Sequence, residues 1–224
     1  MEKTARLLNS LKKKRVAQMM TLSLIVFFYF MGCFGILTPE QFARSVSLTP
    51  FIITLSLLVV LIFSEAPWKL RTILMYLLIT ALGYLVEVLG SNTHMIFGSY
   101  TYGKTLGFKL FNTPLLIGLN WLFLVYASAS VLEHFKLHVV LKIILSSLIM
   151  LVYDIILEPV AMKTDMWHWN NSTVPVRNYI AWFVIAIVLH TILKSANIST
   201  RNPIAGFVLL CQFLFFLTLH IFLK

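Results

Sequence analysis

The sequence predicts an all-α, polytopic integral membrane bundle of about seven transmembrane helices, in a single transmembrane domain over residues 1–224. Three observations support this fold class. Hydrophobic residues make up 59% of the chain and charged residues 12%, whereas soluble domains carry roughly 25% charged residues. The apolar residues form continuous runs and not the alternating pattern of a membrane β-barrel. Because a helix satisfies its own backbone hydrogen bonds in lipid, such runs indicate spanning helices.

Seven segments approach the length of about 20 residues that crosses an apolar core of about 30 Å. The second and the sixth are the shortest. The first follows the charged residues Lys12–Arg15 and is too long for a signal-peptide core, so we expect it to be retained as a helix. In chain order the predicted spans are Val16–Leu37, Leu48–Phe63, Leu70–Leu89, Pro114–Leu132, Val139–Glu158, Tyr179–Lys194 and Pro203–Leu223.

Lys and Arg residues are distributed unevenly between the two ends of these spans. Of the 18, twelve lie on the side of the N-terminus and six on the other side, and half of the twelve fall within the first 15 residues. The positive-inside rule therefore predicts a cytoplasmic N-terminus and an outside C-terminus. The net charge of +10 fits this topology and contacts with membrane lipids, because the basic residues are scattered and form no patch for a nucleic acid. We expect the protein in the cell (inner) membrane of a bacterium or archaeon.

The two longest predicted loops, Ser91–Thr113 and Pro159–Asn178, lie on the same, non-cytoplasmic side of this topology. Each follows a predicted span that carries carboxylates, Glu87 in one case and Asp154 with Glu158 in the other. At a rise of about 1.5 Å per residue, Glu87 and Asp154 lie roughly 20 to 26 Å from the cytoplasmic ends of their helices. We therefore expect these acids to meet at one depth beneath the two loops.

Glu87, Asp154 and Glu158 are the catalytic candidates, because a carboxylate inside a membrane is costly and usually faces a site. Asp154 and Glu158 are one helical turn apart and share a face. Two like charges so close repel each other, so at least one is expected to keep its proton and to serve as a general acid. Asn120 falls at a similar depth and is expected to join them. The alternative is structural: the acids pair with Lys or Arg, or hydrogen-bond across helices and hold the bundle together.

Aromatic side chains gather near the same depth. We expect them to line a substrate pocket and to stabilise a developing cation through their ring faces. His168, close to Glu158, is a candidate for orienting a group or moving a proton. The alternative for each aromatic residue is an anchor at the membrane interface. The substrate-binding candidates are Tyr100, Tyr102, Asn120, Trp121, Trp167, His168 and Trp169.

The sequence argues against several other kinds of site. Cys33 and Cys211 stand alone in apolar runs, and no His or Cys spacing is typical of a metal site, so no metal is predicted. Gly98, Gly103 and Gly107 indicate tight turns or close approach to a bound molecule, but they do not form the strand–turn–helix pattern of a nucleotide site. The last predicted span has no internal Lys for a retinal Schiff base.

Short segments around the candidate residues form a combined pattern. They are Glu87-Val-Leu-Gly90, Phe97-Gly-Ser-Tyr100-Thr-Tyr102, Leu106-Gly107, Pro114, Asn120-Trp121, Asp154, Glu158-Pro159-Val-Ala161 and Trp167-His-Trp169. With this pattern the sequence resembles the membrane carotenoid biosynthesis family that includes the carotenoid 1,2-hydratases, such as bisanhydrobacterioruberin hydratase and gamma-carotene hydratase. The resemblance covers about residues 80–170. Each piece is weak alone, and together they are fairly specific.

The resemblance implies addition of water across the terminal C1–C2 double bond of an acyclic carotenoid end group, giving a tertiary alcohol. Protonation of the alkene creates a tertiary carbocation, which water then captures, and no metal or organic cofactor is required. On this basis Asp154 or Glu87 donates the proton, and Glu158 orients or deprotonates the water. The expected partners are the carotenoid substrate and membrane lipids, with other carotenoid-pathway enzymes as candidates.

Two further functions fit the same residues. A small membrane lycopene cyclase would use the same acid and the same cation, which an internal double bond would capture in place of water. A non-enzymatic carotenoid-binding protein or transporter is the alternative from a different class. Transport predicts a polar path that continues below the midplane, whereas Ile143–Met150 is apolar apart from Ser146 and Ser147.

Overall fold

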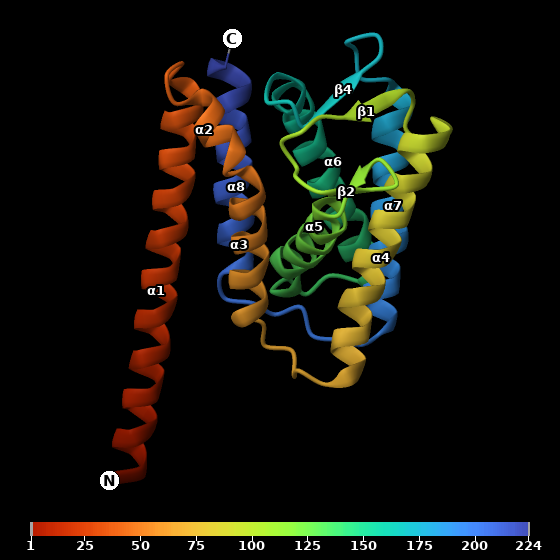
Figure 1. The fold of residues 1–224 in the computed structure, drawn as a ribbon. Coiled ribbons are helices and arrows are strands. Elements are labelled where there is room, and N and C mark those ends of the chain that lie inside the picture. The colour runs from red at the N-terminus through yellow and green to blue at the C-terminus, as the bar shows by residue number, and fades with distance from the viewer. Residues whose placement is uncertain (1, 224) are drawn as a thin grey trace.

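The computed structural model describes residues 2–223 of the chain, with side chains described for residues 12–223. Lys3, Arg6 and Lys224, which contribute to the predicted charge asymmetry, have side chains outside this part. Helices dominate the described chain (Figure 1). Their bounds are α1 (Glu2–Leu37), α2 (Phe42–Ser47), α3 (Thr49–Ile62), α4 (Leu70–Thr93), α5 (Leu116–Glu133), α6 (Val139–Lys163), α7 (Val176–Ser195) and α8 (Ala205–Phe222).

The predicted all-α, polytopic membrane architecture is confirmed. Six helices of the described chain are long and apolar enough to cross a membrane. The remaining predicted span is α3, which has 14 residues. At about 1.5 Å per residue it extends for roughly 21 Å, short of an apolar core of about 30 Å. The chain is therefore an integral membrane protein with six long apolar helices and one shorter one.

Helix α6 extends beyond its predicted end at Glu158. Pro159 lacks the backbone N–H that an interior helical residue donates, and a proline often ends a helix. Here the helix continues to Lys163, because Val160 and Ala161 on its next turn are fully buried in the core. As a result, Glu158 is held inside a regular helix and not at a frayed end.

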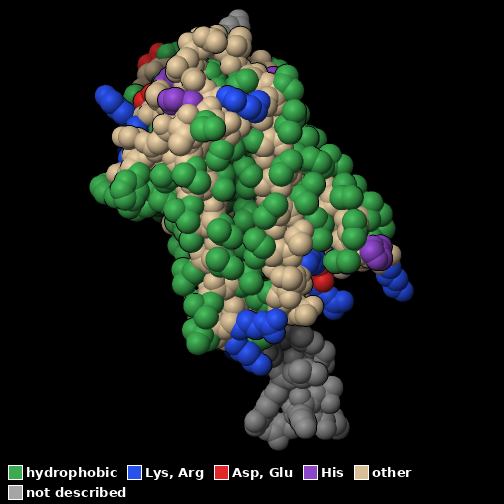
Figure 2. Space-filling model, turned by 90° about the vertical axis from the view of Figure 1, so that its right-hand side faces the viewer, with side chains coloured by type: hydrophobic (Ala, Val, Ile, Leu, Met, Phe, Trp, Pro, Cys, Tyr) green, Lys and Arg blue, Asp and Glu red, His purple; other side chains and the backbone are tan. Residues whose placement is uncertain are grey.

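Helix α5 is the centre of the bundle. In its apolar window 83% of the residues are buried, compared with 22 to 33% in the other five long helices. It packs against α3, α4, α6 and α8. Gly83 of α4 permits a close approach to α5, since a β-carbon there would lie 2.5 Å from the side chain of Trp121. The outer helices expose apolar side chains, and Figure 2 shows this apolar surface between two ends that carry Lys and Arg.

The two long loops meet at one end of the bundle, as the sequence predicts. Strand β1 (Tyr100–Tyr102) of the first loop pairs antiparallel with β4 (Trp167–Trp169) of the second. The first loop also forms a small hairpin from β2 (Lys109–Leu110) and β3 (Thr113–Pro114). Helix α1 begins at the opposite end of the bundle from the loops, and α8 finishes near them (Figure 1). Which end faces the cytoplasm stays a prediction.

Candidate active site

Two three-residue strands cover the loop end of the bundle. In the β1–β4 pair, Tyr100 lies opposite Trp169, and Tyr102 lies opposite Trp167. Side chains of a strand alternate between its two faces. These four aromatic side chains all lie on the inner face and are buried. The cover therefore presents two tyrosines and two tryptophans to the helices below it.

His168 lies on the outer face of this cover. Its side chain is about half exposed, and its Nε2 lies 2.7 Å from Oδ1 of Asp165. That hydrogen bond, with a second from the backbone N–H of Lys104, holds the pKa of the Asp165 carboxyl below its usual range. Gly103 lets the two loops approach here, since a β-carbon would lie 2.1 Å from the Asp165 carbonyl oxygen. The structure thus places His168 outside the pocket that the sequence predicted for it, where it helps to fasten the loops together.

Glu87 of α4 is buried and accepts three side-chain hydrogen bonds. The hydroxyls of Tyr100 and Tyr102 donate to its Oε2 at 2.7 and 2.6 Å. The indole N–H of Trp121 donates to Oε1 at 3.0 Å. Burial, reinforced by the charge of Glu87, raises the pKa of both tyrosines well above the ordinary range, so each keeps the proton that it donates. The carboxyl group of Glu87 is thus held by three side chains, of which the two tyrosine hydroxyls can accept a hydrogen bond as well as donate one.

Glu158 of α6 is the second buried carboxylate. The indole N–H groups of Trp167 and Trp169 both donate to its Oε2 at 2.8 Å. The side-chain amide of Asn178 donates to Oε1 at 3.0 Å, and the same nitrogen lies 3.0 Å from Oδ2 of Asp154. Oδ1 of Asp154 is buried and meets no hydrogen-bond partner within the described part of the chain. One amide therefore links two carboxyl groups that lie a helical turn apart.

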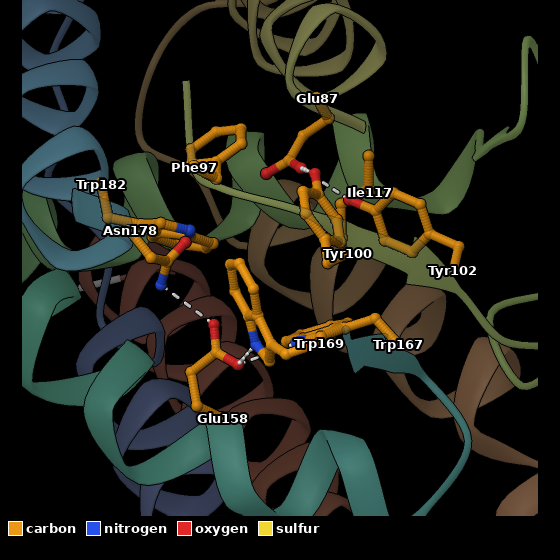
Figure 3. A pocket seen from close by; sticks show the side chains of 10 residues that line it. All are labelled: Glu87, Phe97, Tyr100, Tyr102, Ile117, Glu158, Trp167, Trp169, Asn178 and Trp182. Carbon is orange, nitrogen blue, oxygen red and sulfur yellow. Dashed lines mark hydrogen bonds between the residues drawn. The ribbon is translucent and has the colours of Figure 1, made fainter. Parts of the chain in front are cut away.

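A small space of about 20 Å³ lies between Glu87 and Glu158. That volume holds about one water molecule. Figure 3 shows the two carboxylates on opposite sides of the space, with aromatic rings between and around them. The lining residues are Glu87, Phe97, Tyr100, Tyr102, Ile117, Glu158, Trp167, Trp169, Asn178 and Trp182.

The structure brings most of the predicted site residues together and separates a few. The four aromatic residues of the cover line the space with Glu87 and Glu158, and Asp154 is not part of the lining. Trp121 reaches Glu87 from outside the space through its indole nitrogen. Asn120 lines a neighbouring space, and its Oδ1 meets no hydrogen-bond partner in the described chain. Glu87 and Glu158, one acid from each half, line the same space, whereas Asp154, Asn120 and His168 do not.

Sequence analysis missed Asn178, which the predicted topology left at the end of a loop. In the structure it belongs to the first turn of α7, where it lies within reach of both α6 carboxyl groups. Trp182, one turn further along α7, also lines the space and stacks on Trp121 with ring centroids 4.3 Å apart. The spacing of four residues that places Asn178 and Trp182 on one helical face is the signal that could have revealed them.

A second buried polar cluster lies deeper in the bundle. His190 of α7 has its Nε2 2.9 Å from Oγ of Ser128 and its Nδ1 3.4 Å from Oγ of Ser147. This layer is more polar than the sequence predicted, because α5 and α7 contribute to it as well as α6. Met150, one turn from both Ser147 and Asp154, is buried between the two levels. An apolar step on α6 therefore separates this cluster from the carboxylates.

The arrangement offers acid–base chemistry next to an aromatic wall. Two carboxylates face one small space, and ring faces beside it can stabilise a cation. Among the described residues, no three His, Cys, Asp or Glu side chains form a group suited to a metal ion. The site can therefore move a proton to and from an apolar molecule and shelter a positive charge while it does so.

A family profile described as carotenoid biosynthesis protein matches residues 47–223. The chain belongs to this family. The match runs from the start of α3 to the end of α8, so it includes both carboxylates and both strands of the cover. Neither a curated protein nor a solved structure gives a significant match. Membership of the carotenoid biosynthesis family confirms the predicted resemblance and indicates a role in a carotenoid pathway.

Proposed function

We propose that this carotenoid biosynthesis protein is a hydratase that adds water across the terminal C1–C2 double bond of an acyclic carotenoid, giving a tertiary alcohol. The observation that carries the proposal is the one-water space between Glu87 and Glu158, walled by aromatic rings. Hydration of an alkene needs an acid, a base and one guarded water molecule. Two carboxyl groups line this space, which has room for about one water molecule. A cyclase that forms the same cation has no use for a water held beside it.

In this proposal the pair of Asp154 and Glu158 supplies the proton. Two carboxyl groups that share one amide donor in a buried site are most stable with a single proton between them. Glu158 is the member that faces the space, so it delivers the proton to C2, and a tertiary cation forms at C1. This revises the sequence-based roles, in which Asp154 or Glu87 was the donor, because Asp154 does not line the space.

Glu87 acts from the opposite side. In this proposal Glu87 is the unprotonated carboxylate, and its charge stabilises the cation across the space. As the water oxygen bonds to C1, Glu87 takes the proton that the water loses. The balance is one water added to the alkene, and the proton on Glu87 returns to the Asp154 and Glu158 pair before the next turnover. We propose that Tyr100 and Trp169 shape the pocket, and that no metal or organic cofactor takes part.

We also infer that the chain forms one domain over residues 1–224, because the central helix α5 packs on helices from the early, middle and late parts of the sequence. We place the N-terminus in the cytoplasm and the site near the outer side of the cell membrane, from the distribution of Lys and Arg. The substrate would then meet the carboxylates within the bilayer, in the leaflet on that side.

Expression in a bacterium that makes lycopene or gamma-carotene tests the proposal, with extracted pigments measured by mass spectrometry. A hydratase yields pigments heavier by one water, and the Glu158→Gln protein yields none at the same protein level. An isomer of unchanged mass would support the cyclase. Unchanged pigments in both hosts, with the protein present in the membrane, would reject hydration of these substrates.

A further inference from the structure

A second, much larger cavity lies between α1, α2, α3 and α8. Its volume is about 530 Å³, within the range of about 300–1,000 Å³ typical of small-molecule sites. Met31 and Phe51 on its wall are exposed on the lipid-facing surface, whereas Ile53 and Phe216 are buried in the core. The cavity therefore extends inward from the molecular surface, where the exposed Glu40 and Arg44 also line it. Helix α2 lies at the same end of the bundle as β1 and β4 (Figure 1), so the cavity is at the end that holds the carboxylates.

A small space lies between this cavity and the candidate active site and shares a wall with each. Ile53 and Phe216 line both the large cavity and a space of about 20 Å³. Ile117 and Trp167 line both that space and the one between the carboxylates. The three spaces therefore lie in series and share walls, from the lipid surface to Glu158. A thin, long molecule is the shape that such a series accommodates.

Buried acceptor atoms along this series point to a ligand. Gln212 is one of the residues that line the large cavity and is 1% exposed, and its buried Oε1 meets no hydrogen-bond partner among residues 12–223. Its Nε2 donates to the Tyr153 hydroxyl at 2.7 Å, and Tyr153 lines the small intervening space. In that space Oδ1 of Asn120 is also without a partner in the described chain. Both atoms are acceptors, so each can pair with a hydroxyl, the group that hydration creates.

We propose that the large cavity binds the polyene chain of the carotenoid whose end group reacts between Glu87 and Glu158, and that the chain enters sideways from the membrane between α1 and α3. This proposal rests on the proposed function. The end group passes Ile53 and Phe216, whose side chains must move apart, and reaches the carboxylates while the rest of the polyene stays in the cavity. The new hydroxyl pairs with Asn120 and then with Gln212 as the product leaves.

Filling the cavity tests the proposal. Ile52 lies on the cavity wall, and Ile52→Trp places a large ring in the path of the chain. Leu58 is on the same helix, is 51% exposed to the lipid side and is outside the cavity lining, so Leu58→Trp is the matched control. Each protein is purified in mild detergent from a lycopene-making bacterium, and retained lycopene and hydrated product are measured per protein. We expect at least a tenfold fall in both for Ile52→Trp and parent values for Leu58→Trp.

A second measurement uses the unmodified protein, so that it stands even if Ile52→Trp does not fold. A linear polyisoprenoid carrying a diazirine is photolysed in membranes, and the labelled peptides are mapped. We expect labels on α1, α3 and α8 residues of the cavity that excess lycopene suppresses. Labels that lycopene does not suppress would mean that the cavity holds ordinary lipid, and the proposal would fail.

The outcomes for the cavity and for the hydratase are distinguishable. A parent protein that hydrates lycopene, with Ile52→Trp equally active, overturns the cavity proposal and leaves the proposed function intact. Suppressible labelling of the cavity without any hydrated product supports the binding site and rejects the hydratase. Glu158→Gln is expected to retain lycopene at the parent level while forming no product.

Discussion

The Glu87 and Glu158 halves of the site hold their carboxylates with three donors each, yet the donors differ in kind. Two of the donors to Glu87 are tyrosine hydroxyls, which can accept a hydrogen bond as well as donate one. Two of the donors to Glu158 are indole N–H groups, which can only donate. Glu158 instead shares its third donor with a second carboxyl group, Asp154. Equal numbers of hydrogen bonds thus come from different kinds of donor, and this difference underlies the proposed roles of Glu87 as proton acceptor and Glu158 as proton donor.

The largest effect is expected at the proton-supplying half. Glu158→Gln removes the proposed proton donor, and we expect the hydration rate to fall by about 10³- to 10⁴-fold, near the upper range for general acid catalysis. Product per protein, measured by mass spectrometry from lycopene-making cells, checks this. Glu65→Gln changes an exposed carboxylate far from the site and is the control. If the Glu158→Gln protein hydrates the substrate at the parent rate, Glu158 is not the acid.

Glu87→Gln tests the opposite half. The variant keeps much of the hydrogen bonding but loses the charge and the base, so we expect a fall of about 10²- to 10³-fold. We expect a smaller loss than for Glu158→Gln, because a second water molecule can accept a proton in place of a missing base more readily than it can donate one in place of a missing acid. Side-by-side rates with equal membrane levels of the two proteins provide the measurement. A larger loss at Glu87 than at Glu158 would reverse the two roles.

Asp154→Asn separates the acid pair. The neutral amide leaves Glu158 in place but removes the partner that favours a shared proton, so we expect about a tenfold fall in kcat with little change in KM. The readout is the dependence of the hydration rate on pH, whose profile should move relative to the parent profile. A purely structural role for Asp154 would lower the amount of folded protein and leave the profile of the remainder unchanged.

Asp165→Asn should have the smallest effect of these substitutions. Asp165 joins the two loops on the outer side of the cover, and its side chain contacts neither Glu87 nor Glu158. The pKa of Asp165 is lowered in the folded protein, so its ionised form adds stability above its unfolded value of about 3.9. That stability is lost as pH falls through the lower, folded pKa. The group is about half exposed, so we expect the variant to lower Tm near pH 7 by at most about 3 °C. Thermal unfolding at pH 7 and below pH 4 checks this, and the two proteins should converge at the lower pH.

The helices were predictable because their apolar runs are long. The depths of Glu87 and Asp154 placed the acids of the two halves at one level, but they did not show that Glu158 is the acid that shares a space with Glu87. The direction in which individual side chains point was not predictable from the sequence. Asn120 and Trp121 are adjacent on α5 and point about 100° apart, so depth alone could not show that Trp121 meets Glu87. The outward orientation of His168 depends on the register of two three-residue strands, because a shift of one residue exchanges the inner and outer faces. Asn178 is twenty positions from Glu158, and only the packing of α7 on α6 joins them.

The distribution of tryptophan has a consequence for how the protein can be observed. Of the five tryptophans, Trp167, Trp169 and Trp182 line the space between the carboxylates, and Trp121 stacks on Trp182. Trp68 alone lies exposed at the start of α4. Four of the five tryptophans therefore lie at the candidate active site, and a polyene that binds there should quench their ultraviolet emission. Stopped-flow fluorescence could then time the arrival of the substrate separately from its conversion, with no label attached to either molecule.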